Sequence, residues 1–186
     1  MDQHEALERL QDTELKIMLD VADVCAELGI TWFMDSGTAL GAIRHQGFIP
    51  WDDDIDLGMM RADYNRFVTE APALLALRGL SLHTTSNTSG FAALFAKVFR
   101  DGTHFETLET REAGLKQGIF VDVFPYDLLW VDSARRSRQI SVARTAQRRS
   151  YLYHASSIAV PHKGALGAFE KAGCFVMHHI ERLIHW

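Results

Sequence analysis

Acidic residues at alternating positions are the part of this sequence that could carry chemistry. They lie in the run Trp51-Asp52-Asp53-Asp54-Ile55-Asp56-Leu57-Gly58. A strand over residues 54–57 would direct Asp54 and Asp56 to one face of a sheet, while Ile55 and Leu57 enter a core. Two neighbouring carboxylates repel each other unless a cation joins them. Because hard divalent cations prefer carboxylate oxygens, the pair predicts a site for Mg²⁺, with Mn²⁺ as an alternative.

A turn of small residues upstream could hold phosphate. Ser36, Gly37 and Thr38 follow an apolar run over residues 30–34 and precede a predicted helix over residues 38–45. Backbone N–H groups at the start of a helix have no partner within the helix, and they bind phosphate oxygens. The sequence therefore predicts a phosphate-binding turn shortly before the acids.

A third acid, Asp122, lies inside the run Gly118-Ile119-Phe120-Val121-Asp122-Val123-Phe124-Pro125. A solitary carboxylate among strand-forming residues is costly to bury unless it is paired or bound to metal. The alternative is an exposed position on an edge strand. Together with Asp54 and Asp56, Asp122 indicates a two-cation phosphoryl-transfer site. In such a site an unliganded carboxylate oxygen can take the proton of the incoming hydroxyl.

Three further residues near these motifs have two readings each. Arg44 could bind a donor phosphate through both guanidinium nitrogens, or it could be an ordinary exposed helix residue. His45 could assist acid–base chemistry or complement the dipole at the end of its helix. Trp51 could stack on a base or cap a choline head group, or it could pack against the protein.

The surrounding elements predict a mixed α/β fold in which a small mixed sheet presents the acids at one edge. Apolar residues at helical spacing predict a long first helix that ends at Gly29. A helix over residues 61–77 is expected to be bent or divided by Pro72. Strands are predicted over residues 30–34, 54–57, 80–84, 92–100 and 118–124.

The C-terminal third is predicted to be helical. Residues 135–149 contain six arginines and no acid, which favours the solvated face of a helix over a surface for a glycan, a nucleotide phosphate or a membrane. Residues 164–186 carry apolar side chains at helical spacing and predict a core-packing helix. Contact with a partner or a membrane surface is the alternative for this last segment.

The run from Trp32 to Phe67 resembles the LicD family of the nucleotidyltransferase-fold superfamily, which also includes the fukutin-related proteins. The resemblance covers about residues 15–128. The motifs that carry it are Asp35-Ser36-Gly37-Thr38, Leu40-Gly41-Ala42-Ile43-Arg44-His45, Gly47-Phe48-Ile49-Pro50-Trp51-Asp52-Asp53-Asp54-Ile55-Asp56 and Arg61-x-Asp63-Tyr64-x-x-Phe67.

The resemblance implies a metal-dependent phosphotransferase with a nucleotidyltransferase-like small mixed sheet flanked by helices. Such an enzyme moves phosphocholine or a similar phospho-alcohol from CDP-choline, or another CDP-alcohol, to a hydroxyl of a cell-surface glycan. Lipopolysaccharide, teichoic acid and capsule are the implied acceptors. The family's small-residue turn matches Ser36, Gly37 and Thr38, and its Asp-x-Asp pair matches Asp54 and Asp56. Its third acid matches Asp122, and its basic strand matches Lys97 and Arg100.

Two other functions fit the same residues. One is a nucleotidyltransferase that moves NMP from an NTP to a small acceptor, with pyrophosphate as the product. The other is a non-catalytic nucleotide-binding protein, because the sequence stops at Trp186 before the C-terminal elements of the family and so resembles a short or truncated member. The expected organisation is a single domain over residues 1–186, with its core at about 15–128 and a helical extension over about 132–186.

Composition agrees with one compact enzyme domain of 186 residues, 47% hydrophobic and 23% charged. The net charge of −5 argues against general nucleic-acid binding. Cys25 and Cys174 lie far apart and are expected to be small core residues in a reducing compartment. The charged start of the sequence and its short apolar runs predict neither a secretory signal segment nor a membrane-spanning stretch. A cytoplasmic protein is expected, with possible peripheral contact with membrane-linked glycan intermediates at the inner face of the membrane.

Overall fold

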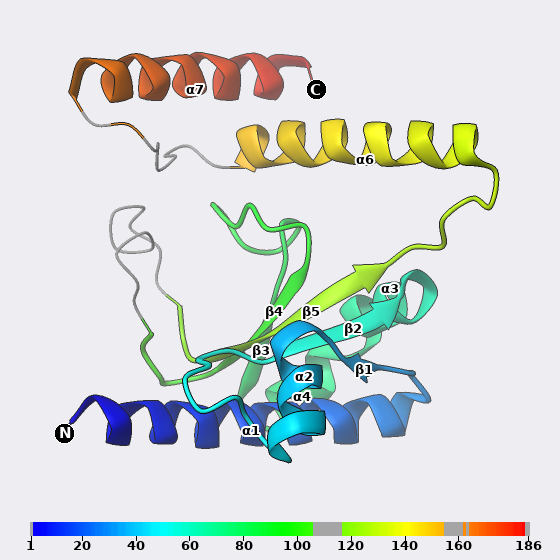
Figure 1. Cartoon of the computed structure of the whole chain (residues 1–186), viewed down its shortest axis with the longest axis vertical. Helices are drawn as coiled ribbons and strands as arrows, with labels where there is room; N and C mark the ends of the chain where they lie inside the picture. Colours follow the sequence, from blue (N-terminus) through cyan, green and yellow to red (C-terminus); the bar gives the residue numbers. More distant parts are fainter. Residues whose placement is uncertain (1, 106–116, 155–161, 163, 185–186) are drawn as a thin grey trace. The chain divides into compact units, whose positions relative to one another are not determined.

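The structure is a computed structural model that describes residues 2–105, 117–154, 162 and 164–184. These residues form two compact units, which are described separately (Figure 1). Within the described ranges, the first unit comprises residues 2–83, 95–105 and 117–127, and it holds every residue that the sequence predicts for the site. The second unit comprises residues 84–94, 128–154, 162 and 164–184. The expectation of a single domain therefore stays a prediction.

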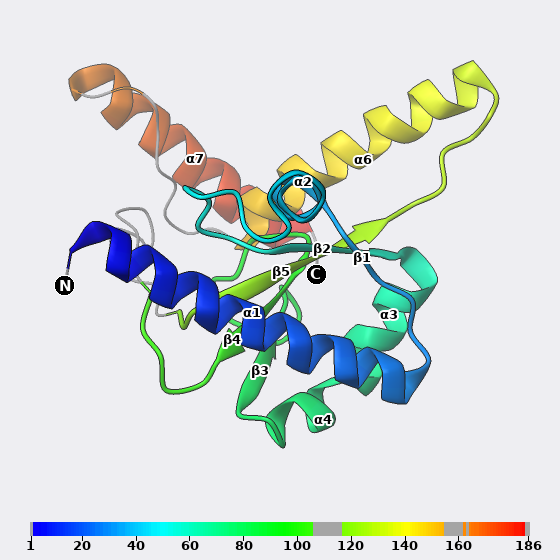
Figure 2. The same cartoon turned by 60° about the horizontal axis from the view of Figure 1, so that its bottom comes forward.

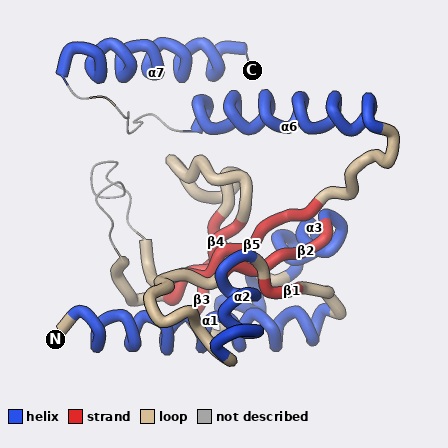
Figure 3. The backbone as a smooth tube through the Cα atoms, viewed as in Figure 1, coloured by secondary structure: helices blue, strands red, loops and turns tan. Residues whose placement is uncertain are grey.

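The first unit is built on one five-stranded mixed sheet, drawn in red in Figure 3. The strands are β1 (Phe33–Met34), β2 (Asp56–Met60), β3 (Leu80–His83), β4 (Ala96–Arg100) and β5 (Phe120–Tyr126). They lie side by side in the order β1-β2-β5-β4-β3. Only β2 and β5 run parallel to each other; the other three pairings are antiparallel. The predicted mixed α/β fold is confirmed.

Helices cover one face of this sheet. They are α1 (Gln3–Leu28), α3 (Arg61–Glu70) and α4 (Pro72–Ala76), and α1 runs across the strands in Figure 2. A further helix, α2 (Ser36–His45), contacts β2. Gly29 ends α1 in the left-handed conformation at φ 62°, as predicted. Pro72 begins α4, which divides the predicted helix over residues 61–77.

Alternation along the strands separates a core face from a site face. The parallel register places Leu57 beside Val123, and the antiparallel register places Val98 beside Val121. All four side chains are fully buried and belong to the core beneath the helices. Their neighbours in the strands point to the opposite face. Asp56, Asp122 and Lys97 therefore share the face that these helices leave open.

The strand bounds differ from the predicted ones. β2 begins at Asp56, so Asp54 lies in the preceding loop rather than in a strand. The Ile55 carbonyl still accepts from the Asp122 N–H of β5 at 2.9 Å, but at Asp52 the N–H donates to the Ile49 carbonyl and the carbonyl accepts from the Gln11 side chain. Ile55 is nevertheless 2% exposed, so the predicted alternation of burial holds. β4 starts four residues later than expected, at Ala96, and β5 extends to Tyr126.

The second unit contains two long helices, α6 (Ser133–His154) and α7 (Gly164–Ile184). None of the described residues of α6 is buried, so its predicted solvated character is confirmed. The predicted core-packing role of α7 is wrong for its described residues. Its buried positions are Gly167, His178 and Glu181, while its apolar side chains, among them Phe169 and Leu183 at 78%, are exposed. The physical reason is that α7 contacts α6 through polar groups such as the Arg149–Glu181 ion pair.

Two further expectations concern the cysteines and the membrane. Cys25 is fully buried in α1, as predicted, whereas Cys174 is only half-buried in α7, and neither forms a disulfide. Burial raises the pKa of the Cys25 thiol to about 12. Over the ranges that the structure covers, no helix combines the length and apolar composition that a membrane crossing requires. Residues 155–161, 163, 185 and 186 of the predicted helical extension lie outside the described residues.

Close packing of α2 on the following loop makes Gly41 sensitive to substitution. A β-carbon at Gly41 would lie 2.6 Å from the Gly47 carbonyl oxygen and 3.0 Å from the Ile49 nitrogen, and backbone atoms cannot easily move aside. Gly41→Ala is expected to lower the free energy of unfolding by about 1–3 kcal/mol, although alanine favours helix. Urea denaturation would measure this. Gly47→Ala is the control, since its β-carbon meets nothing within 4 Å. Equal stability of the two variants would contradict the prediction.

Candidate active site

The centre of the candidate site is a row of three charged residues on neighbouring strands. The register pairs Asp56 of β2 with Asp122 of β5, and Asp122 with Lys97 of β4. Residues in register on adjacent strands present their side chains on the same face, about 5 Å apart. The sheet topology therefore brings two predicted acidic residues and one predicted basic residue together from segments that lie far apart in the sequence.

Lys97 neutralises Asp122. Its Nζ donates a hydrogen bond to Asp122 Oδ2 at 3.1 Å. It also lies 2.8 Å from Oδ1, an ion-pair contact whose direction does not suit a hydrogen bond. Both side chains are largely buried, and Lys97 Nζ lies 3.3 Å from the centre of the Phe120 ring. Burial raises the pKa of Asp122, which Lys97 opposes, and burial lowers the pKa of Lys97, which Asp122 opposes.

The start of α2 fixes the position of Asp56. The Asp56 N–H donates to Thr38 Oγ1 at 2.8 Å, and the Asp56 carbonyl accepts from the Asp35 N–H at 3.0 Å. Burial and the nearby charges of Asp54 and Asp122 raise the pKa of Asp56 to about 6, whereas a hydrogen bond with the Ser36 side chain lowers it. The predicted phosphate turn and Asp56 are thus joined by a hydrogen bond from the Asp56 backbone to the Thr38 side chain.

The first turn of α2 keeps its N–H groups free of a side-chain cap. Asp35 occupies the cap position, but its carboxylate makes no capping hydrogen bond and instead accepts from the Tyr126 hydroxyl. Ser36 holds a left-handed backbone at φ 46°, which is strained for a residue other than glycine. Gly37 lies so close to Asp52 that a β-carbon would come within 2.6 Å of its Oδ2. An uncapped helix N-terminus beside acids is the arrangement expected for phosphate accompanied by a cation.

A second group of acids lies in the loop before β2. Asp52, Asp53 and Asp54 each offer one carboxylate oxygen, and these three oxygens lie within 4.8 Å of one another. Burial, then Asp52 and Asp53, raises the pKa of Asp54, and Lys97 lowers it. Oxygen-only ligands at this spacing, with excess negative charge, are the donor set that Mg²⁺, Mn²⁺ or Ca²⁺ takes. The residues present therefore fit a hard divalent cation.

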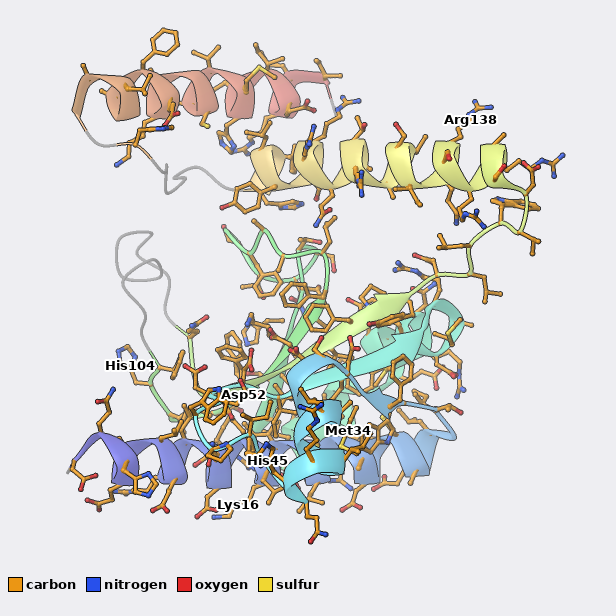
Figure 4. The ribbon with its side chains drawn as sticks, viewed as in Figure 1. Lys16, Met34, His45, Asp52, His104 and Arg138 are labelled. Atoms are coloured by element: carbon orange, nitrogen blue, oxygen red, sulfur yellow. The ribbon has the colours of Figure 1, made fainter. Side chains whose placement is uncertain are left out.

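The remaining predicted site residues differ in whether they lie where a ligand could reach them. Arg44 and Trp51 are exposed, Trp51 at 76%, so both can reach a ligand in solvent. Arg100 is not brought to the acids. It lies three residues from Lys97, which in a strand is the opposite face, and its guanidinium pairs with Asp20 at 2.7 Å and donates to the Arg78 carbonyl. His45 is exposed at the end of α2 (Figure 4).

Three residues near the acids were not anticipated from the sequence. Glu14 is buried in α1, and Gln11, one turn earlier, holds the acidic loop by donating to the Asp52 carbonyl at 2.8 Å. Asp52 lies beside α1 in Figure 4. Tyr126 binds Asp35 from the end of β5. Glu14 lay within reach of sequence reasoning, because positions 7, 10, 14, 17, 21 and 24 follow one helical stripe, whereas the contacts of Gln11 and Tyr126 depend on tertiary structure.

Comparison with known families agrees with this geometry. A family model described as LicD/FKTN/FKRP, nucleotidyltransferase domain, matches residues 29–163, which is most of the chain. The chain belongs to the LicD family. The resemblance seen in the sequence is therefore confirmed, and the matched residues include the small-residue turn, both acidic segments and Lys97.

Individual relatives cover smaller parts. Lipopolysaccharide cholinephosphotransferase LicD of Haemophilus influenzae is 36% identical over 109 residues, which are 56% of this chain and 38% of that protein. Ribitol 5-phosphate transferase FKRP of Homo sapiens is 42% identical over 43 residues, 23% of this chain and 9% of that protein. An uncharacterized protein of Rickettsia prowazekii is 46% identical over 48 residues, 26% and 18% of the two chains. The chain thus matches less than two fifths of the length of each of these relatives.

Proposed function

We propose that this LicD-family chain is a metal-dependent transferase that moves a phospho-alcohol from a CDP-alcohol to a hydroxyl of a cell-surface glycan. The observation that carries the proposal is the row of Asp56, Asp122 and Lys97 beside the uncapped start of α2. The names of two relatives support it, since one transfers cholinephosphate and the other ribitol 5-phosphate. Both names describe the phosphate ester of an alcohol. Phosphocholine from CDP-choline, with lipopolysaccharide or teichoic acid as acceptor, is the specific form that we propose.

The proposed roles follow from where each group lies. Ser36, Gly37 and Thr38 would hold donor phosphate through the free N–H groups of α2. Asp54 and Asp56 would hold Mg²⁺, which would supply positive charge to the phosphate oxygens as charge develops on them. Arg44 and Trp51 are exposed and available for the donor, Trp51 through stacking on the base or contact with the choline head. Transfer to membrane-linked glycans would take place at the cytoplasmic face of the membrane.

The reaction is a single in-line displacement. The acceptor oxygen forms a bond to the phosphorus that carries the alcohol, and the bond from that phosphorus to the bridging oxygen breaks. CMP leaves with the bonding electrons, and the acceptor proton passes to a carboxylate. Asp122 suits this last role, because burial raises its pKa and Lys97 holds it in place. Once Asp122 is protonated, the Lys97 ammonium can face the transferred phosphate instead.

Calorimetric titration of CDP-choline and CDP-ribitol, with and without Mg²⁺, tests the donor. CMP release in the presence of a lipopolysaccharide or teichoic acid extract then tests the transfer. We expect Mg²⁺-dependent binding of one donor and CMP release that depends on the acceptor. Release of pyrophosphate from an NTP, without CMP, would replace the proposal by nucleotidyl transfer. Donor binding without any product would indicate a non-catalytic nucleotide-binding protein.

Gly37→Ala should weaken donor binding about tenfold, the loss expected when one hydrogen bond to a charged group is disturbed. The new β-carbon would displace the Asp52 carboxylate and narrow the phosphate turn. Since the atom it meets is the free end of a side chain, unfolding by urea should change little. The same titration applied to Gly47→Ala, whose β-carbon meets nothing, is the control. Unchanged donor affinity in Gly37→Ala would remove the turn from the donor site.

A further inference from the structure

Glu14 is a buried acid on the apolar side of α1. It is 1% exposed and follows Leu7 and Leu10 along the stripe that continues with Ile17 and Val21. Its Oε2 has no hydrogen-bond partner in the described part of the chain. A carboxylate is costly to bury in this state, because the water it loses is not replaced by a donor or a cation. Glu14 thus needs a partner that the described protein atoms do not provide.

The neighbours of Glu14 are acids rather than bases. Burial first, and then the charges of Asp54, Asp53, Asp122 and Asp52 in that order, together raise the pKa of Glu14 to about 9. Lys97 is engaged with Asp122. Between residues 2–105 and 117–154 no ion pair joins an arginine or lysine to Glu14 or to the loop residues 52–54. The excess negative charge is therefore concentrated between α1 and this loop.

The geometry around Glu14 is held in place. Gln11, one turn before Glu14, donates to the Asp52 carbonyl at 2.8 Å and so fixes the loop to α1. The three loop oxygens already lie within 4.8 Å of one another. Ligand oxygens on opposite sides of Ca²⁺ lie up to about 5.2 Å apart, and those around Mg²⁺ up to about 4.2 Å. The loop would thus need little or no movement to hold a divalent cation, and Glu14, which is not one of these three residues, would add its oxygen by a rotation of its side chain.

We propose that Glu14 is a ligand of a divalent cation bound between α1 and the loop Asp52–Asp54. The site is made of carboxylates, and Oε2 of Glu14 completes it from the core side. It differs from the proposed catalytic cation site in its ligands, because that site uses Asp56 of β2, whereas this one uses Glu14 of α1 and the loop acids. It rests on the proposed function only in sharing Asp54. Its role is to tie α1 to the acidic loop and so to position Asp54.

The alternative is a Glu14 that remains protonated and neutral, as a filler of the core. Glu14→Gln separates the two, since glutamine has the same shape as a neutral glutamic acid and cannot replace a carboxylate ligand of a cation. Glu8→Gln is the matched control. It makes the same charge change in the same helix, at an exposed residue whose carboxylate lies near His4.

The experiment uses the full chain without nucleotide. Mn²⁺ binding is followed by the loss of the free-ion electron paramagnetic resonance signal, and the thermal midpoint is recorded against Mg²⁺, Ca²⁺ and Mn²⁺ concentration. We expect Glu8→Gln to bind Mn²⁺ as the unmodified protein does. Glu14→Gln should bind at least about tenfold more weakly, and its midpoint should respond less to the cations. Equal Mn²⁺ affinity in Glu14→Gln and Glu8→Gln would overturn the proposal.

A second variant guards against misfolding. Asp53 is exposed, so Asp53→Asn should not disturb the core, yet it should also weaken nucleotide-free Mn²⁺ binding. Unchanged affinity in Asp53→Asn would overturn the proposal even if Glu14→Gln did not fold. The proposed function fails separately. Absence of CMP release with intact, Glu14-dependent Mn²⁺ binding would refute transfer alone, and CMP release with Glu14-independent binding would refute this inference alone.

Discussion

Asp56→Asn is expected to lower the rate of CMP release about a thousandfold or more while the protein stays folded. The backbone of residue 56 is fixed by Thr38 and Asp35, so asparagine would occupy the same place without the charge that a cation needs. The comparison requires kcat with the donor and acceptor that the titrations identify. Asp12→Asn, at an exposed position of α1, is the matched control and should keep the normal rate.

The stability of Asp56→Asn provides a separate check. The pKa of Asp56 is raised in the folded protein, so ionisation of this carboxyl opposes folding. In the cation-free protein its contribution is therefore most favourable at low pH and is lost as the pH rises toward about 6. Asparagine does not ionise, so at pH 7 the variant should resist urea at least as well as the unmodified protein. A near-normal kcat in a folded Asp56→Asn protein would refute the proposed role of this acid.

The sequence predicted the parts of the site that depend on local pattern. Alternation of acids and apolar residues correctly predicted that Ile55 and Leu57 are buried beside the two acids. The small residues Ser36, Gly37 and Thr38 form the first turn of α2 itself, whereas the sequence predicted a turn that precedes a helix over residues 38–45. The partnership of Asp122 with Lys97 could not be derived in the same way, because it depends on the register of β4 against β5. Register follows from the packing of whole strands, so only the fold places these residues side by side.

Arg100 and Glu14 were within reach of simple periodicity. The three-residue spacing from Lys97 places Arg100 on the other face of a strand, where it pairs with Asp20 of α1. The heptad-like spacing of the apolar residues in α1 includes position 14, so an acid there is a departure from the pattern. Such departures occur where function overrides local preference, and a break in a clean stripe is worth testing first.

Helix α7 is a case in which periodicity predicted the helix but not the exposure of its apolar side. Its apolar spacing correctly predicts a helix, but periodicity reports only that one side is apolar and not what covers that side. In its own unit, α7 meets α6 through His178, which contacts the Leu152 carbonyl, and through Glu181, which binds Arg149. Phe169 and Leu183 remain exposed. A core assignment needs a second apolar surface, and the arginine-rich sequence of α6 does not offer one.

Lys97→Met is expected to lower the free energy of unfolding by about 3 kcal/mol, the cost of leaving a buried charge without its partner. Lys97 and Asp122 are 16% and 11% exposed, so water can compensate only in part. The loss should shrink at acidic pH, because a raised pKa lets Asp122 take a proton and become neutral. Urea denaturation of the cation-free protein at pH 5 and pH 8 measures both effects.

Two further variants test whether the loss of stability in Lys97→Met comes from the unpaired charge of Asp122. Lys97→Met combined with Asp122→Asn removes both charges and should be more stable than Lys97→Met alone. Arg61→Met breaks the exposed pair with Asp127, whose side chains are 45% and 51% exposed, and should cost at most about 1 kcal/mol. If Lys97→Met proved no less stable than Arg61→Met, burial would not make Asp122 dependent on Lys97. The role of Lys97 would then be to bind a phosphate ligand rather than to neutralise Asp122.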